Sequence, residues 1–393
     1  MRTQSRVHGK ALVLLLLIYL SYVSLGLPDG AFGVAWPAIY PDSRLPIGTA
    51  GTLTLIGTVV SALAAFNSGW IIGRLGTGRT VAASCVVTGS ALLLMSQTAG
   101  YAGLLGVWML LSIGAGAVDS GLNGFVARHY SGRHMNWLHA CWGLGATLGP
   151  LLMGLALAGV VGWRGGYVAL GSIQAGLAIV LLLTLRLWAS APERPVDGSG
   201  IEGNATLPTR GANSTEGFLS ALIFALYVGA EATAGVWAAT VLVVDRSISK
   251  PVAGVCAACF YGAIMLGRLL TGAVVERTGN RRMVRSGMLL AIVGAVFFAL
   301  ASSVWLEAAA LVLLGLGLAP VYPCLMHEVP RRFAPEAVQT MIGRQSGAGA
   351  IGFAVLPAAA GLIAQWRVDL VPWLVVAGAA ALFVAIRELD RRS

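Results

Sequence analysis

Three carboxylic acids lie deep inside long apolar stretches of the chain: Asp29, Asp119 and Glu231. Each is at least seven residues, about 10 Å along a helix, from the nearest expected helix end. An ionisable side chain at membrane depth is costly and by default marks a site or an ion pathway. A carboxyl group held away from water can take up a proton near neutral pH, so we predict proton-coupling roles for all three. The alternative for each is a structural hydrogen bond or ion pair with another helix.

The first acid has unusual neighbours, because Pro28 and Gly30 flank Asp29. Proline removes a helix hydrogen bond and glycine loosens the turn. Backbone groups freed at membrane depth are tolerated against protein or a water-filled cavity. We therefore expect a broken helix here with Asp29 facing a cavity, and the alternative is an ordinary helix kink.

A polar and aromatic set around these acids could bind a hydroxyl-rich solute, which needs hydrogen bonds and an aromatic face. Asn123 follows Asp119 by one helical turn and lies on the same face. The alternative for the aromatic members and for the histidine is ordinary packing. The predicted substrate-binding residues are Asn123, Asn136, His139, Trp142, Trp237, Tyr322 and Gln345.

The elements that position these residues follow from the composition. Of 393 residues, 57% are hydrophobic and 11% are charged, against about 25% charged in soluble proteins. The 52 glycines suit close helix packing in a membrane. The net charge of +10 does not indicate nucleic acid, because the basic residues lie in short loops between apolar runs. No metal-ligand cluster, phosphate loop or hydrolase triad is found, so we expect no enzyme activity and no cofactor.

Twelve stretches are long enough to span a bilayer as helices. The expected fold is an all-α membrane protein with two six-helix bundles around a central cavity. The N-terminal bundle is residues 1–188, the polar cytoplasmic linker 189–216 and the C-terminal bundle 217–393. The expected spans are 11–39, 49–73, 79–98, 101–127, 135–160, 165–188, 217–244, 251–275, 281–303, 305–329, 338–364 and 369–386.

The basic residues predict the orientation of these spans. If the N-terminus is cytoplasmic, nineteen Lys and Arg residues fall on the inside and five on the outside. The positive-inside rule then predicts that both termini are cytoplasmic. We expect a multi-pass protein of the cell inner membrane.

Two glycine-rich basic turns resemble the cytoplasmic signature of the major facilitator superfamily. Gly272-x-x-x-Glu276-Arg277 follows the eighth span and has the acid of that signature. Its counterpart after the second span departs from it, because Gly73 stands where the acid is expected. The resemblance implies a latch of paired charges that opens during transport. The residues it implies for this cytoplasmic gate are Arg74, Arg79, Gly272, Glu276, Arg277 and Arg281.

Spans 1, 4 and 7 resemble a narrower group, the fucose:proton symporter family. The fourth span has Asp119 followed four residues later by Asn123, the first has Asp29, and the seventh is similar to bacterial glucose and mannose members around Glu231. One departure is that Asp119 stands where the fucose permease has Glu. Another is that Gly145-x-x-x-Gly149-Pro150-x-x-x-Gly154 resembles the fifth-helix motif of drug:proton antiporters.

These resemblances imply a proton-coupled secondary transporter that moves a small polar solute by alternating access, with a monosaccharide favoured. Sodium is the alternative coupling ion. Two other functions remain open: proton-driven export of a drug or metabolite, and a non-transporting membrane sensor on the same fold. The expected partners are a small-molecule substrate, the coupling ion and the lipid bilayer, without nucleic acid, and we expect a monomer.

Overall fold

The computed structural model describes residues 2–130, 132–188 and 211–392, and nearly all of them are helical. Within these ranges, twelve helical segments are long and apolar enough to cross a membrane. Their ends agree with the predicted spans to within six residues. The prediction of an all-α, twelve-span protein is confirmed.

The helices of the first half differ from the prediction at one end. The sixth span ends at Leu183, and Leu185–Trp188 forms a separate short helix, α7. The helices are α1 Arg2–Asp42, α2 Thr49–Leu75, α3 Thr77–Met95, α4 Gly100–His129, α5 Gly132–Ala158, α6 Gly162–Leu183 and α7 Leu185–Trp188.

The second half has more interrupted helices. The tenth span consists of α11 and α12, which meet at Ala319 and Pro320, where proline lacks the amide donor of a continuing helix. The seventh ends in a π-helical turn, Val241–Asp245, after α8. The helices are α8 Thr215–Thr240, α9 Lys250–Thr278, α10 Asn280–Leu300, α11 Val304–Leu318, α12 Val321–Arg332, α13 Pro335–Trp366 and α14 Val371–Arg392.

The described residues fall into two compact units. We call those of Met1–Leu45 and Ile56–Gly198 the N-terminal unit, and those of Pro46–Leu55 and Ser199–Ser393 the C-terminal unit. The start of α2 belongs to the C-terminal unit because the glycines of α2 allow the backbone of α13 to pack closely against it. A Cβ at Gly51 would lie 2.8 Å from the Cα of Ala358. Of the predicted linker 189–216, residues 189–210 lie outside the described residues, and α8 begins at Thr215 with Ser214 as its N-cap.

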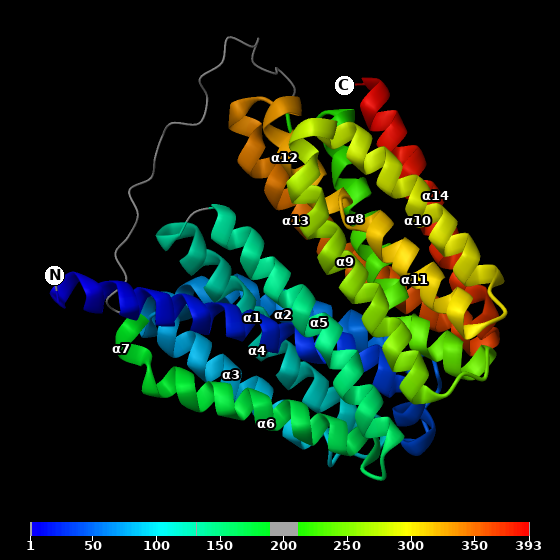
Figure 1. Cartoon of the computed structure of the whole chain (residues 1–393), viewed down its shortest axis with the longest axis horizontal. Coiled ribbons are helices and arrows are strands. Elements are labelled where there is room, and N and C mark those ends of the chain that lie inside the picture. Colours follow the sequence, from blue (N-terminus) through cyan, green and yellow to red (C-terminus); the bar gives the residue numbers. More distant parts are fainter. Residues whose placement is uncertain (1, 131, 189–210, 393) are drawn as a thin grey trace. The chain divides into compact units, whose positions relative to one another are not determined.

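In the N-terminal unit, α1 packs along α5, and α3 packs against both α4 and α6 (Figure 1). Glycines bring α1 and α5 close together. A Cβ at Gly145 would lie 2.0 Å from the carbonyl oxygen of Val23, and one at Gly30 would lie 2.2 Å from that of Ala146. The expected break at Asp29 is wrong, because α1 continues through Pro28 without interruption. The packed surface of α5 supports the helix where proline removes one of its hydrogen bonds.

In the C-terminal unit, α8 packs against α13 and α14, while α11 packs between α9 and α10 (Figure 1). The glycine-rich turns after the second and eighth spans share one local structure. Gly76 and Gly279 have φ values of 81° and 78°, which glycine adopts without a steric penalty. Each therefore joins two consecutive spans through a tight turn.

Candidate functional site

Asp29 lies in the middle of α1, and its side chain is exposed on the surface of the N-terminal unit. Trp142 of α5 donates a hydrogen bond from Nε1 to the Asp29 carboxylate at 2.9 Å. The close packing of α1 and α5 makes this contact possible, because Gly26 faces the backbone of Trp142 itself. The acid is therefore held by a neutral donor at membrane depth.

Asp119 of α4 is also exposed and also held by neutral donors. Tyr22 of α1 donates to Asp119 Oδ1 at 2.7 Å, and Asn123 Nδ2 donates to the same oxygen at 3.0 Å. The ring of His139 packs edge-on against Tyr22, with centroids 5.8 Å apart. Tyr22 is buried and thereby connects α1, α4 and α5 beneath the two exposed acids.

The two acids are close enough to interact electrostatically. Seven residues separate Tyr22 from Asp29, about two helical turns, so both lie on one side of α1. We call this set the polar cluster of the N-terminal unit. Its members are Tyr22, Asp29, Asp119, Asn123, His139 and Trp142.

Glu231, the third acid, has a different environment. Tyr227 donates to Glu231 Oε2, and Arg268 of α9 lies 3.3 Å from the same oxygen. Arg268 also donates to the Tyr227 hydroxyl at 3.0 Å. The Tyr322 ring packs near Tyr227, with centroids 6.2 Å apart, and edge-on against Phe224. The charge of Glu231 is thus compensated within the C-terminal unit.

The other predicted binding residues do not join these groups. Trp237 is fully buried and donates to the carbonyl oxygen of Pro357 at 3.0 Å. Gln345 is 1% exposed and donates to Ser220 Oγ at 2.7 Å. Both side chains are packed inside the C-terminal unit, where they have structural partners. The backbone of Asn136 lies in α5, and its side chain lies outside the described residues.

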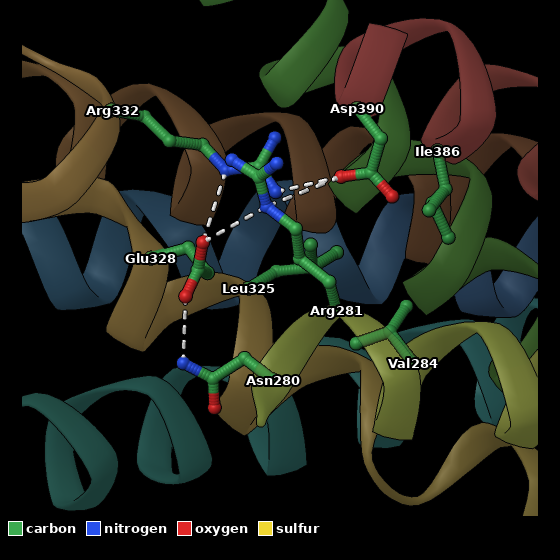
Figure 2. Close-up of a pocket in the computed structure, with 8 residues that line it drawn as sticks. All are labelled: Asn280, Arg281, Val284, Leu325, Glu328, Arg332, Ile386 and Asp390. Carbon is green, nitrogen blue, oxygen red and sulfur yellow. Dashed lines mark hydrogen bonds and ion pairs between the residues drawn. The ribbon is translucent and has the colours of Figure 1, made fainter. Parts of the chain in front are cut away.

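Three charged residues with buried side chains, Glu328, Arg332 and Asp390, lie with Asn280 and the exposed Arg281 at the ends of α10, α12 and α14 (Figure 2). Arg332 Nη2 lies 2.8 Å from Asp390, and their side chains are 5% and 2% exposed. Glu328 accepts from Asn280 at 2.8 Å and lies 3.5 Å from Arg332. Arg281 lies 3.7 Å from Glu328 and 3.9 Å from Asp390. We call these five residues the charge cluster.

The predicted gate residues meet this cluster at one position, Arg281. Glu276 and Arg277 are exposed. Glu276 forms no ion pair with any of the residues that the structure describes. The acids that pair with Arg281 are instead Glu328 and Asp390, from helices distant in sequence. Gly272 is exposed, with no atom within 4 Å of a Cβ built on it.

The matching turn of the N-terminal unit has no such cluster among its described residues. The Arg74 guanidinium lies over the Trp70 ring, 4.0 Å from its centroid. Arg74 and Arg79 are both exposed. This agrees with the sequence, in which Gly73 stands where the acid of the turn is expected.

Sequence reasoning missed four partners that complete these sites. Tyr22 and Arg268 hold predicted acids, while Glu328 and Asp390 hold Arg281. One local signal was available, since Glu328 and Arg332 are four residues apart and so share a helix face. The other contacts join separate helices. Within the described residues, no group of three or more His, Cys, Asp or Glu side chains could hold a metal ion.

Comparisons with known proteins agree with this architecture. A family model described as Major Facilitator Superfamily matches residues 18–242 and, in a second match, residues 219–392. Comparison with curated proteins found no match.

Solved structures share the fold at low sequence identity. A bacterial homologue of the human lysosomal transporter Spinster, inward-facing and occupied, is 15% identical with a TM-score of 0.75, covering 96% of each chain. The nucleoside transporter NupG is 12% identical with a TM-score of 0.73, covering 95% of this chain and 98% of its own. The Spinster homologue in its unoccupied inward-facing form is 15% identical with a TM-score of 0.68, covering 98% of this chain and 95% of its own.

Proposed function

Because this chain belongs to the Major Facilitator Superfamily, we propose that it carries a small polar solute, with a monosaccharide favoured, across a membrane together with a proton. The family assignment makes it a multi-pass membrane transporter rather than an enzyme. The finer proposal rests on one observation. Asp29 and Asp119 are exposed side chains at mid-span, held by neutral donors and close enough to interact.

An exposed carboxylate at the middle of a span is too costly to face lipid chains. We infer that the surface bearing the polar cluster lines a water-accessible pathway. Protonation of either acid removes the electrostatic interaction between them. It therefore changes the relative free energies of the outward-open and inward-open states if the acids differ in exposure to water between these states. A ligand or proton shifts such an equilibrium by its unequal affinity for the states. That difference supplies the coupling.

The polar cluster also suits a hydroxyl-rich solute. Asp119 and Asn123 offer an acceptor and an amide, and the half-buried Trp142 offers an aromatic surface. A sugar ring pairs its hydroxyl groups with the former and its apolar face with an aromatic ring. In the C-terminal unit, the Glu231–Arg268 pair and Tyr322 are the candidates for polar and aromatic contacts with such a solute.

The motif shared with drug:proton antiporters has a packing explanation in this protein. A Cβ at Gly149 would lie 2.1 Å from the carbonyl oxygen of Leu27, so that glycine is required for contact between α1 and α5. Close contact of these helices is needed whichever way a solute moves. The motif therefore gives export no specific support.

The experiment is uptake of labelled monosaccharides by proteoliposomes under an imposed inward proton gradient. We expect accumulation by the wild type and loss of accumulation in Asp119→Asn, which keeps an acceptor for Tyr22 but cannot titrate. Accumulation in Asp119→Asn equal to the wild type would remove Asp119 from coupling. Binding of sugar without any flux in the wild type would support the sensor function, and drug efflux without sugar uptake would support export.

The membrane and orientation are proposed on the sequence. Nineteen basic residues would lie inside and five outside if both termini are cytoplasmic. We propose the cell inner membrane on this basis, with the chain acting as a monomer.

A further inference from the structure

A small cavity lies inside the N-terminal unit, behind the surface that bears Asp29. It has a volume of about 20 Å³, and its polar lining residues are Ser24, Asp29, Thr88 and Gln174. A space of about 10–15 Å³ is enough for one water-sized occupant. The first two residues come from α1, and Thr88 and Gln174 come from α3 and α6.

Three of these polar side chains are almost completely buried. Ser24, Thr88 and Gln174 are 5%, 3% and 4% exposed. Buried polar groups are costly unless they have partners. Gly114 of α4 helps to hold Thr88 in place, since a Cβ there would lie 2.5 Å from Thr88 Cγ2. The polar lining is thus fixed by the packing of four helices.

The hydrogen bonds of these residues leave mainly acceptors for the cavity. Gln174 Nε2 donates to Thr88 Oγ1 at 2.6 Å, and Thr88 Oγ1 donates to the carbonyl oxygen of Cys85 at 3.2 Å. Ser24 Oγ donates to the carbonyl oxygen of Ser21 at 2.8 Å. Each hydroxyl has one hydrogen, so the hydrogens of Thr88 and Ser24 are already used. The Ser24 oxygen keeps both lone pairs as acceptors, and the Thr88 oxygen keeps one beside the hydrogen bond that it accepts from Gln174.

Pro28 adds a further acceptor. Proline has no amide hydrogen, so the carbonyl oxygen four residues earlier, that of Ser24, lacks its helical donor. Ser24 and Pro28 both line the cavity. The Asp29 carboxylate, which accepts from Trp142, completes the set. Among the described residues that line the cavity, Asp29 is the one charged side chain, and Asp119 is the titratable group that interacts with it.

We propose that this cavity binds one small monovalent cation, Na⁺, through these oxygens, with its charge balanced by the ionised carboxylate of Asp29. A carboxylate with neutral hydroxyl and carbonyl oxygens is the ligand type that hard cations prefer, and backbone carbonyls freed in transporter helices coordinate such ions. The inference rests on the proposed function and deepens it, because Na⁺ in this cavity would compete with the coupling proton for Asp29, inside the N-terminal unit. It assigns Thr88 and Gln174 as ligands of the cation.

The test uses the purified full chain in detergent, so it needs no transported solute. One arm compares the thermal unfolding midpoint in NaCl and in choline chloride at a fixed pH. The other arm follows the midpoint against pH in choline chloride. We expect the midpoint to be higher in NaCl than in choline chloride. A midpoint that changes with pH but is the same in both salts would report protonation of carboxyl groups without a bound cation and would overturn the proposal.

Matched variants decide whether the cavity is responsible. Thr88→Val and Gln174→Leu each remove an oxygen and should weaken the cation response about tenfold, since hydrogen bonds to charged groups have that magnitude. Thr80→Val is the control, because Thr80 is equally buried on α3, bonds to its own helix at Gly76, and does not line the cavity. Gln174→Glu adds a negative charge and should strengthen the response.

An equal response in the wild type, Thr88→Val and Gln174→Leu would overturn the proposal and leave the cavity with water alone. A weaker response in Gln174→Glu would overturn it too, which covers the case in which the apolar variants fail to fold. Cation binding that persists while no sugar is taken up would overturn the proposed solute and leave this site intact.

Discussion

The acids of the N-terminal unit and the acid of the C-terminal unit all lie well inside their spans but have different partners. Asp29 and Asp119 accept hydrogen bonds from Trp142 and Tyr22, which are neutral. Glu231 lies 3.3 Å from Arg268. A neutral donor stabilises a carboxylate without cancelling its charge, whereas an arginine cancels it. The difference favours the N-terminal unit for proton exchange and the C-terminal unit for a fixed ion pair.

The glycine-rich turns of the two units also differ in their partners. The arginine of the C-terminal turn forms ion pairs, and that of the N-terminal turn contacts an aromatic ring. Arg281 of the C-terminal unit is held by Glu328 and Asp390. Arg74 of the N-terminal unit lies on the Trp70 ring. Arg281 is exposed, but its acids Glu328 and Asp390 are buried and also pair with the buried Arg332, so loss of one of these acids is costly. An exposed cation over a ring contributes little. Helix ends that look alike in sequence are therefore held very differently.

The largest effect expected is functional and tests the neutral-donor acids directly. Asp29→Asn should abolish solute accumulation under a proton gradient, since the amide cannot carry a proton, while exchange of solute across the membrane continues. Proteoliposome uptake and counterflow measure the two activities. Asp42→Asn is the matched control, because Asp42 is an exposed partner of Arg164 at the end of α1. The Asp42→Asn variant should accumulate solute like the wild type. Accumulation by Asp29→Asn would break the comparison.

The next effect concerns the charge cluster. Asp390→Asn should lower the free energy of unfolding by about 3 kcal/mol, because it leaves the buried Arg332 without its closest partner. The midpoint of thermal unfolding in detergent reports the change. Glu388→Gln, two residues earlier on α14, should cost less than about 1 kcal/mol, since its partners are exposed. Equal losses in both variants would show that burial does not set the cost.

A smaller loss is expected at the ion pair of the third acid. Arg268→Leu should cost about 2 kcal/mol, the range for a hydrogen bond to a charged group, because Glu231 keeps Tyr227 as a donor. The double variant Arg268→Leu/Glu231→Leu should recover part of that loss, because no unpaired charge then remains. Thermal unfolding of the two variants compares them. A double variant less stable than Arg268→Leu would contradict a compensated pair.

The smallest effect belongs to the N-terminal turn. Arg74→Leu should cost about 0.5–1 kcal/mol, the magnitude of an exposed cation–ring contact. Trp70→Leu should cost the same, since each variant removes that contact, and the same unfolding assay compares them. A loss in Arg74→Leu as large as in Asp390→Asn would remove the distinction between the two turns.

The sequence predicted the spans closely because each is a long apolar run, and such a run must be helical in a bilayer to pair its backbone groups. It also identified Asp29, Asp119 and Glu231 as residues to examine, since charge is rare in those runs. It did not predict that α1 stays continuous at Pro28, because the support comes from α5. It placed Trp237 and Gln345 among the binding residues, and the structure gives each a buried structural partner.

The sequence by itself determined the class of this protein, its twelve spans and the depth of its three acids, because hydropathy along one chain is a local property. Tertiary structure alone decided which acid is paired and which is not. Asn123 and Tyr227 are neighbours of Asp119 and Glu231 on the same helices, but Tyr22, Arg268 and the acids that pair with Arg281 come from other helices, up to 109 residues away for Asp390. Composition carries no information about which helix faces will meet, and the packing of those faces decides whether a carboxylate has a neutral donor or an arginine beside it.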